Sequence, residues 1–236
     1  MAKIDCGHYI DEPVISGEDV LCIGEGKSFS QFFLLNGNKN RLPFKGLSLA
    51  SGAVAELCLI IMPETDAELS LTVDIIGEGA EANIAVAYLC GASEKVSIST
   101  DIRHRVPGCV SNQLIKGLAG GSSHAFFNGR IVVAPDAQKT EAYQANHNII
   151  LTDKARVDTK PQLEIYADDV RCSHGATIGA LNLDERFYMR SRGITEEEAK
   201  LLQIISFISP VLEKIPESED KESLTLKVTE AIKNLL

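Results

Sequence analysis

A cysteine and a histidine stand two residues apart in the segment YADDVRCSHGATIG, which runs from Tyr166 to Gly179. In a β-strand, residues two apart point to the same face, and a rise of about 3.3 Å per residue separates Cys172 and His174 by about 7 Å. Thiolate and imidazole are well suited to binding iron, copper or zinc. Because two ligands do not complete a coordination sphere, we expect any further ligands to come from elsewhere, for example from another chain.

The sequence leaves several roles open for this pair. Cys172 can be a metal ligand, a sulfur relay or a packed thiol. A reactive thiol requires a lowered pKa, and His174 or Arg171 can supply the positive charge that lowers it. His174 can ligate a metal through a neutral imidazole whose tautomer is set by a neighbouring group, or it can be hydrogen bonded at an interface.

Composition bounds the class of protein. The chain has 236 residues, a formal charge of −10, 44% hydrophobic residues and no tryptophan. Its length fits one large domain, or one domain with a small appendage. The charge argues against a nucleic-acid partner, because binding phosphates requires clustered Lys and Arg. No apolar run approaches the roughly 20 residues that cross a bilayer, and the start is too polar for a signal peptide. We therefore predict a cytoplasmic protein without a membrane partner.

Cysteine usage points to reduced thiols. The six cysteines lie at positions 6, 22, 58, 90, 109 and 172, and no CxxC pair is present. A zinc knuckle or a thioredoxin-like site is therefore unsupported. Cys58 and Cys90 stand in apolar, strand-like runs, which predicts small buried hydrophobic residues.

The pattern changes from strands to helices near Asp184. Before it, short runs rich in Val, Ile and Thr are separated by Gly, Asp and Asn, which is typical of strands. These runs include LSLTVDII, ANIAVAYL, KVSISTDI, GRIVVA and QLEIYA. We predict a β core over residues 1–184 and a C-terminal helical domain over residues 185–236.

The region after Asp184 predicts two helices. Thr195 and Glu198 have the spacing of a capping box, and Pro210 is expected to kink or end the helix that follows. The expected apolar stripe of this helix is Leu201, Leu202, Ile205 and Ile208. The tail from 217 to 236 predicts a second helix with one apolar face, formed by Leu224, Val228 and Ile232.

A weak repeat runs through the β region at nearly regular intervals. The corresponding positions are Glu68, Ala82, Val96, Val110, His124, Thr140, Val157 and Cys172. We expect each repeat of about 15 residues to form one coil of a β-helix, built from two short strands and two turns. A sandwich with Greek-key connections is the alternative that the periodicity leaves open.

The other polar residues have simpler interpretations. Asp168 and Asp169 are adjacent, which favours a turn over a pair of catalytic carboxylates. Asn146 and Asn148 are two apart and can form a polar ladder inside a solenoid. The remaining candidates are isolated histidines, interpreted as surface or turn residues: His104, His124 and His147. No P-loop GxxxxGK[ST] is present, so we predict that the chain does not hydrolyse ATP.

The stretch from about Phe127 to Arg192 resembles the SufB/SufD family of iron–sulfur cluster assembly proteins, and within it the SufD branch. The matching residues include NIILTDKARVDTKPQLEIYADDVRCSHGATIG and RFYMRSRGI. The resemblance implies a mainly β fold, with a right-handed parallel β-helix (solenoid) core and a small C-terminal α-helical domain. Longer members carry an N-terminal helical domain, which we expect this short form to lack.

The same resemblance implies a function. It suggests a SufD-like, non-catalytic subunit of a cytosolic iron–sulfur cluster assembly complex. Its partners would be a SufC-like ABC ATPase and a SufB-like scaffold, or a second copy of itself. His174, with Cys172, would lie at the dimer interface as a ligand of a transient, nascent cluster, with no cofactor in the isolated chain. The cluster-building cysteine of SufB subunits corresponds to Ile165, so this chain is not expected to build a cluster alone.

The family docks its ATPase through the C-terminal region. The candidates for that surface, or for packing the region against the β core, are Phe187, Tyr188 and Arg192. Two other classes of function stay open. A carbohydrate-active β-helix enzyme would show clustered carboxylates and aromatic residues along one face, which 6% aromatic residues support poorly. A structural homodimer would need neither partner.

Overall fold

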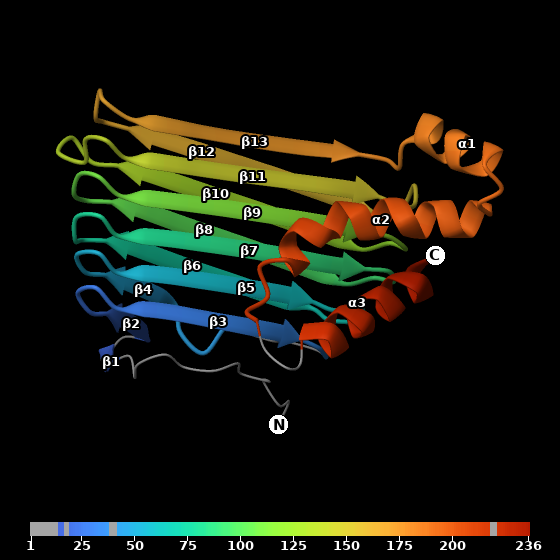
Figure 1. Cartoon of the computed structure of the whole chain (residues 1–236), viewed down its shortest axis with the longest axis horizontal. Coiled ribbons are helices and arrows are strands. Elements are labelled where there is room, and N and C mark those ends of the chain that lie inside the picture. Colours follow the sequence, from blue (N-terminus) through green and yellow to red (C-terminus); the bar gives the residue numbers. More distant parts are fainter. Residues whose placement is uncertain (1–13, 17–18, 38–41, 218–220) are drawn as a thin grey trace.

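The computed structural model describes residues 14–16, 19–37, 42–217 and 221–236, and every structural statement below concerns these residues. They form two sheets followed by three helices (Figure 1). The first sheet, sheet A, contains, in spatial order, β1 (Val14–Ser16), β2 (Val20–Ile23), β4 (Gly46–Leu49), β6 (Ala67–Ile75), β8 (Lys95–His104), β10 (His124–Val133) and β12 (Arg156–Ile165). The second, sheet B, contains β3 (Ser28–Leu35), β5 (Val54–Ile61), β7 (Glu81–Cys90), β9 (Val110–Ala119), β11 (Glu141–Ile150) and β13 (Arg171–Gly179).

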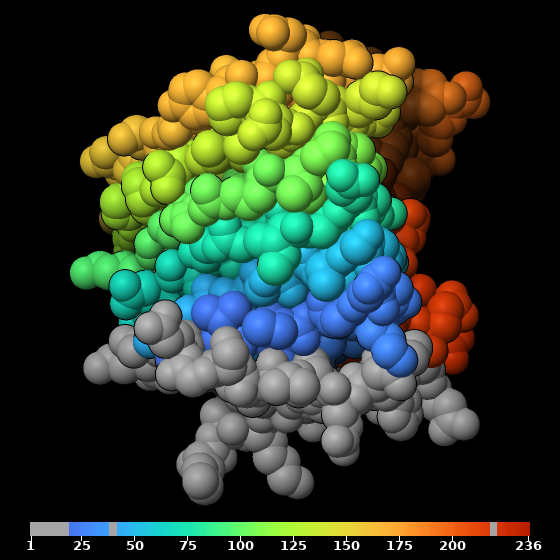
Figure 2. Space-filling model, turned by 90° about the vertical axis from the view of Figure 1, so that its left-hand side faces the viewer, coloured from blue at the N-terminus to red at the C-terminus, as the bar shows by residue number. Residues whose placement is uncertain are grey.

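From β2 onward the chain alternates between the two sheets, and each strand pairs in parallel with the strand two places away in sequence. Among the described strands, only the β1–β2 pair is antiparallel. The result is a parallel β-helix whose coils follow one another in chain order, from β2 and β3 at one end to β12 and β13 at the other (Figure 2). The predicted mainly β solenoid with C-terminal helices is confirmed, and the Greek-key sandwich is wrong.

The predicted coil length was too short by a factor of two. Glu81 on β7 pairs with Val110 on β9, and Val110 pairs in turn with Glu141 on β11, so stacked strands recur at twice the interval of the repeat. Each repeat contains one long strand and one turn, and two repeats complete a coil. Strands of nine or ten residues, such as β6 to β13, leave no room for a second strand in the repeat.

The turns that lead from sheet A to sheet B repeat one conformation. Gly52 and Gly108 have φ of 63° and 69°, a left-handed conformation that costs glycine little. Each donates its backbone N–H to a carbonyl in the next turn, of Glu78 and Gln138 respectively. Lys139 takes the same conformation one coil further on, and its N–H donates to Asp169. The turns therefore stack as the strands do, and Asp169 belongs to a turn, as predicted.

The space enclosed by the two sheets, called the lumen below, contains the main apolar core. Inward positions alternate with outward ones along each strand, as in β8, where every second residue is buried. Large side chains such as Phe33, Phe127 and Ile131 are almost completely inaccessible to solvent. Cys90 is buried in the lumen, as predicted, and burial raises the pKa of its thiol. No disulfide joins the five described cysteines to one another, and Cys6 lies outside the described residues.

The helices are α1 (Leu183–Ser191), α2 (Glu196–Leu212) and α3 (Lys221–Leu235). The capping box of Thr195 and Glu198 begins α2, as predicted. Pro210 does not end the helix, which continues to Leu212. The predicted stripe is shifted, because Leu202 is 48% exposed while Ile204 is fully buried. In a run of consecutive Leu and Ile residues, the sequence does not show which side meets the sheet.

Helices α2 and α3 cover the outer face of sheet B and share a second apolar core with it (Figure 1). Helix α3 contributes Leu224, Val228 and Ile232, as predicted. Cys58 on β5 points outward into this core, where its thiol donates to the carbonyl of Val211 and burial raises its pKa to about 12. The division into domains at residue 184 stays a prediction. No described helix is long and apolar enough to cross a membrane.

Candidate functional site

The last coil of the β-helix presents two long edge strands. β12 ends sheet A and β13 ends sheet B, so within the described residues each pairs with one neighbour only, β10 and β11 respectively (Figure 1). Inward-facing positions are buried in the preceding coils, but the equivalent positions of the last coil have no coil above them. Ile165 and Ile178 are therefore 41% and 45% exposed. Unpaired N–H and C=O groups along a flat edge form a template for another strand. The last coil is therefore an open pairing surface.

Cys172 and His174 lie on β13 and point to the same side, as their spacing predicted. Cys172 is in register with Ala142 and His174 with Gln144, both of which are buried in the lumen. Both side chains therefore face the lumen side of the last coil. Cys172 is half-buried against the apolar core, whereas His174 is exposed.

The structure does not supply the activating charge that a reactive Cys172 requires. Burial raises the pKa of this thiol, and a hydrogen bond to the Ala142 backbone opposes the shift only in part. Arg171 points to the opposite face, where it lies 3.4 Å from Glu141. Burial therefore favours the protonated form of the Cys172 thiol, and a partner would have to provide any charge that ionises it.

The described residues contain no group of three or more His, Cys, Asp or Glu side chains able to hold a metal ion. The pair on β13 supplies two ligands of suitable chemistry, a sulfur and an imidazole nitrogen. Tetrahedral coordination of a metal ion requires four ligands. Any metal bound at this edge would therefore need donors from outside the described residues.

Polar side chains line the lumen beneath the last coil. Asn146 and Asn148 on β11 are buried inside the solenoid and hydrogen bonded to each other, but they do not stack as the predicted ladder, because the residues in register on β9 are Ile115 and Gly117. Gln113 and Gln144, which sequence reasoning missed, are 3% and 2% exposed. Gln144 precedes Asn146 and Asn148 at the same spacing of two, and this pattern in QANHN was the available signal. Its position directly below His174 depends on the register of β11 and β13, which the sequence does not reveal.

Helix α1 projects beyond the strands next to this edge and buries none of its residues (Figure 1). Phe187 and Tyr188 are 75% and 60% exposed, so the structure does not pack them against the β core. Arg192 lies over the Tyr188 ring, 5.4 Å from its centroid. An ion pair between Arg186 and Glu196 at 2.8 Å links α1 to α2. The three predicted docking residues are thus exposed, and Arg192 contacts Tyr188.

The isolated histidines differ from their predicted surroundings. His104 is fully buried in the lumen, 2.8 Å from the Ser111 hydroxyl, and burial lowers its pKa to about 4. The prediction of a surface or turn position was wrong for this residue, because alternation does not reveal which face of a strand is inward. His124 and His147 lie on outer strand faces, hydrogen bonded to Asp158 and Thr177 respectively.

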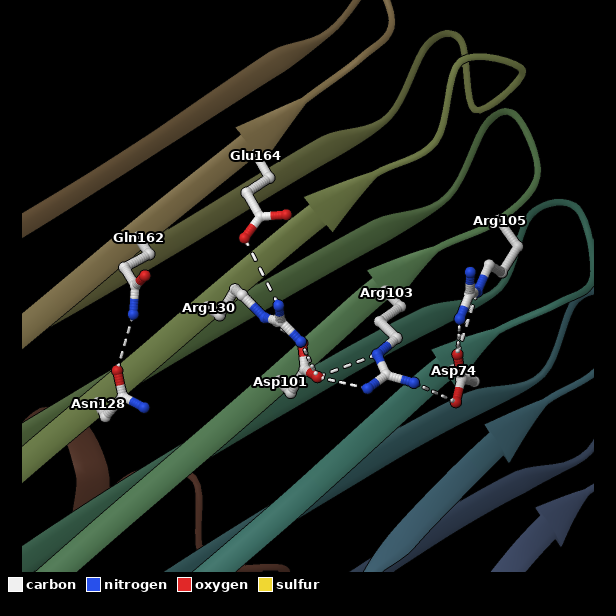
Figure 3. Close-up of polar contacts among 8 residues, drawn as sticks. All are labelled: Asp74, Asp101, Arg103, Arg105, Asn128, Arg130, Gln162 and Glu164. Atoms are coloured by element: carbon white, nitrogen blue, oxygen red, sulfur yellow. Dashed lines mark hydrogen bonds and ion pairs between the residues drawn. The ribbon is translucent and has the colours of Figure 1, made fainter.

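The outer face of sheet A contains the described carboxylates that most resemble an enzyme groove (Figure 3). Asp101 accepts from both Arg103 and Arg130, which hold its pKa below the usual range although partial burial opposes this. The two other carboxylates of this network are also paired with arginines: Asp74 with Arg103 and Arg105, and Glu164 with Arg130. Carboxylates neutralised in this way are not free for acid–base catalysis.

A groove of about 760 Å³ lies on the outer face of sheet B, beside the segment that joins α2 to α3. Several polar side chains that line this groove form hydrogen bonds with neighbouring side chains of sheet B. Asn112 donates to Asn83, Asn83 donates to Glu81, and Tyr143 donates to Glu141. The Asn112–Asn83 bond is a cross-strand polar pair between β9 and β7, and the other two bonds join residues two apart on one strand.

Comparison with known proteins identifies the family of this chain. Residues 34–207, more than half of the chain, match the family described as SUF system FeS cluster assembly, SufBD core domain. The chain belongs to the SufBD core family. The match includes the whole of β13 and α1, and with them both candidate ligands and the three residues predicted for docking.

Named relatives place the similarity in the SufD branch. The iron–sulfur cluster assembly protein SufD of Escherichia coli is 38% identical over 152 residues, covering 64% of this chain and 36% of its own length. An iron–sulfur cluster assembly SufBD family protein of Synechocystis is 43% identical over 133 residues, or 56% of this chain and 29% of its own. SufD of Bacillus subtilis is 28% identical over 189 residues, covering 80% and 43%. The chain spans about a third of the length of the first two relatives.

Proposed function

We propose that this SufBD core protein is a SufD-like, non-catalytic subunit that helps to assemble iron–sulfur clusters. The observation that supports this most directly is the position of Cys172 and His174. Both face the lumen side of an uncovered edge coil, and together they offer only two ligands. A cluster held there would be a product passed through the complex, and its remaining ligands would belong to a partner chain.

The partner proposed for the edge is a SufB-like scaffold or a second copy of this chain. Strand β13 leaves its outer backbone groups unpaired within the described residues, so another strand can extend sheet B. Exposed Ile165 and Ile178 would be covered by such a partner. Because Ile165 occupies the position expected for the SufB cysteine, the proposal assigns the cluster-building thiol to the partner.

A SufC-like ABC ATPase is the partner proposed for α1. Phe187 and Tyr188 are large apolar side chains exposed on a helix without a buried face. Aromatic residues and arginine are enriched in the central parts of protein interfaces. The aromatic pair with Arg192 fits such a surface.

Co-expression with a SufB-like scaffold and a SufC-like ATPase tests the assembly. We expect a stable complex by size exclusion with light scattering, and its failure to form with both proteins would contradict the proposal. A homodimer that excludes both partners would instead support the structural class of function. Phe187→Ala is expected to release the ATPase while the scaffold stays bound.

Cluster formation tests the site itself. The His174→Ala complex is expected to lose most of its iron–sulfur absorbance after reconstitution with iron and sulfide. Ser173→Ala is the matched control, because Ser173 lies on the same exposed strand and points to the opposite face. Equal cluster yield in the two variants would refute the site.

A further inference from the structure

Gln144 is the buried residue directly beneath His174. It lies on β11 in register with His174 on β13 and with Gln113 on β9. Neighbouring strands are about 4.8 Å apart, within the reach of a glutamine side chain. Gln144 is 2% exposed, and neither its amide nitrogen nor its amide oxygen has a hydrogen-bond partner within the described residues. An unpaired buried amide is costly, so its partner has to be identified.

The coil below shows how the oxygen of such an amide is satisfied, although the Gln113 amide nitrogen has no partner within the described residues. There, the Thr100 hydroxyl on β8 donates to the Gln113 carbonyl across the lumen at 2.7 Å. On β10 the position in register with Thr100 is Gly129, which has no hydroxyl to offer. A Cβ at Gly129 would lie 2.3 Å from the Gln144 amide nitrogen, so the glycine leaves space for the amide without binding it.

The coil above Gln144 offers a different partner. On β12 the position in register with Gly129 is Pro161, which also has no polar side chain. The polar side chains in register with Gln144 are the imidazole of His174 above it and Gln113 below it, and the Gln113 oxygen already accepts from Thr100. The Gln144 amide can donate through its nitrogen and accept through its oxygen, so it can hydrogen bond a ring nitrogen of either kind.

We infer that Gln144 is a positioning residue that sets the tautomer and orientation of His174. A ligating histidine presents one ring nitrogen to its metal, and the group bound to the other nitrogen decides which one is free. Gln144 selects that nitrogen from below, while the exposed side of the ring faces the partner. The inference rests on the proposed function for its consequence in cluster assembly, but the position of Gln144 directly below His174 belongs to the isolated chain.

Ring nitrogen NMR of the whole isolated chain, labelled with ¹⁵N at histidine, tests this contact. The chain has five histidines, and His174→Gln identifies the signal of His174. At one alkaline pH, the two ring shifts report the ratio of tautomers. We expect Gln144→Leu to change that ratio about fivefold, which corresponds to about 1 kcal/mol, the size of one ordinary hydrogen bond.

Gln113→Leu is the matched control, because it removes the same buried side chain one coil further from His174. An unchanged His174 signal in Gln144→Leu, or an equal change in both variants, would overturn the inference. Gln144→Met, unbranched and of similar length, replaces Gln144→Leu if the latter does not fold. No partner or cluster is needed for the measurement, so failure of the proposed function would leave its result intact.

Discussion

Gly117 is a position in the lumen where the absence of a side chain allows a buried aromatic ring to approach the backbone closely. It lies on β9 between Tyr88 on β7 and Asn148 on β11, in register with both. The Tyr88 ring passes over the glycine, and its hydroxyl donates to the Asn148 amide oxygen at 2.6 Å. Burial raises the pKa of Tyr88, so the hydroxyl remains a neutral donor.

Gly117→Ala would place a methyl group 2.0 Å from Cζ of Tyr88 and 2.5 Å from the Asn148 amide oxygen. The ring must move, although Tyr88 is only 1% exposed. Overpacking costs about 1–3 kcal/mol, and a buried polar group left unpaired costs a further 1–3 kcal/mol or so. The lower entropy of unfolded alanine offsets about 0.4–1 kcal/mol. We expect a net loss of about 3 kcal/mol in the free energy of unfolding.

Urea unfolding followed by circular dichroism measures this loss. With an m value of about 3 kcal/mol/M, typical of a larger domain, the midpoint falls by about 1 M. Gly175→Ala is the control, because a Cβ on that strand glycine meets no atom within 4 Å, and we expect a change below about 0.5 kcal/mol. If the two variants unfold at the same urea concentration, the argument from close approach is wrong. Tyr88→Leu combined with Gly117→Ala should cost less than the sum of the single changes.

Two further predictions concern pH and the attachment of the helices. His104 has a folded pKa of about 4 against about 6.5 when unfolded, so below pH 6.5 the unfolded state binds more protons. The free energy of unfolding should therefore fall as pH drops from 6.5 to 4, by about 3 kcal/mol for this residue. Over the same pH range, the urea midpoint of His104→Gln should fall less than that of the unmodified chain. Equal falls in the two midpoints would contradict the low pKa of His104. A chain ending at residue 184 should expose the outer face of sheet B that α2 and α3 cover, and should aggregate or bind a hydrophobic dye. A soluble, stable fragment would instead support an independent β domain.

Local patterns predicted elements well because each depends on nearby residues alone. The capping box of Thr195 and Glu198, and the buried face of α3, follow from spacing along one helix. The short repeat in the β region indicated a solenoid because stacked strands must recur at a fixed interval. It gave half of the true coil length, since one strand and one turn repeat in the same way as a whole coil.

Positions across the lumen could not be predicted, because they depend on register between strands far apart in sequence. Alternation shows that Cys172 and His174 share a face, but it does not show that Gln144 lies below His174. It also left the burial of His104 undetermined, since either face of a strand can be the inner one. A one-residue shift in register would reverse each assignment.

The end of the stack explains why the candidate ligands lie where they do. In the interior coils each inward side chain has neighbours above and below, so polar residues there are confined and their partners are fixed, as for Tyr88 and Asn148. On β13 the described chain supplies the neighbour below and leaves the side above open. His174 can therefore be oriented by Gln144 on the strand below and still be reached by a partner chain from above. A ligand shared between two chains needs both properties, and an end coil of a solenoid, unlike an interior coil, provides them together.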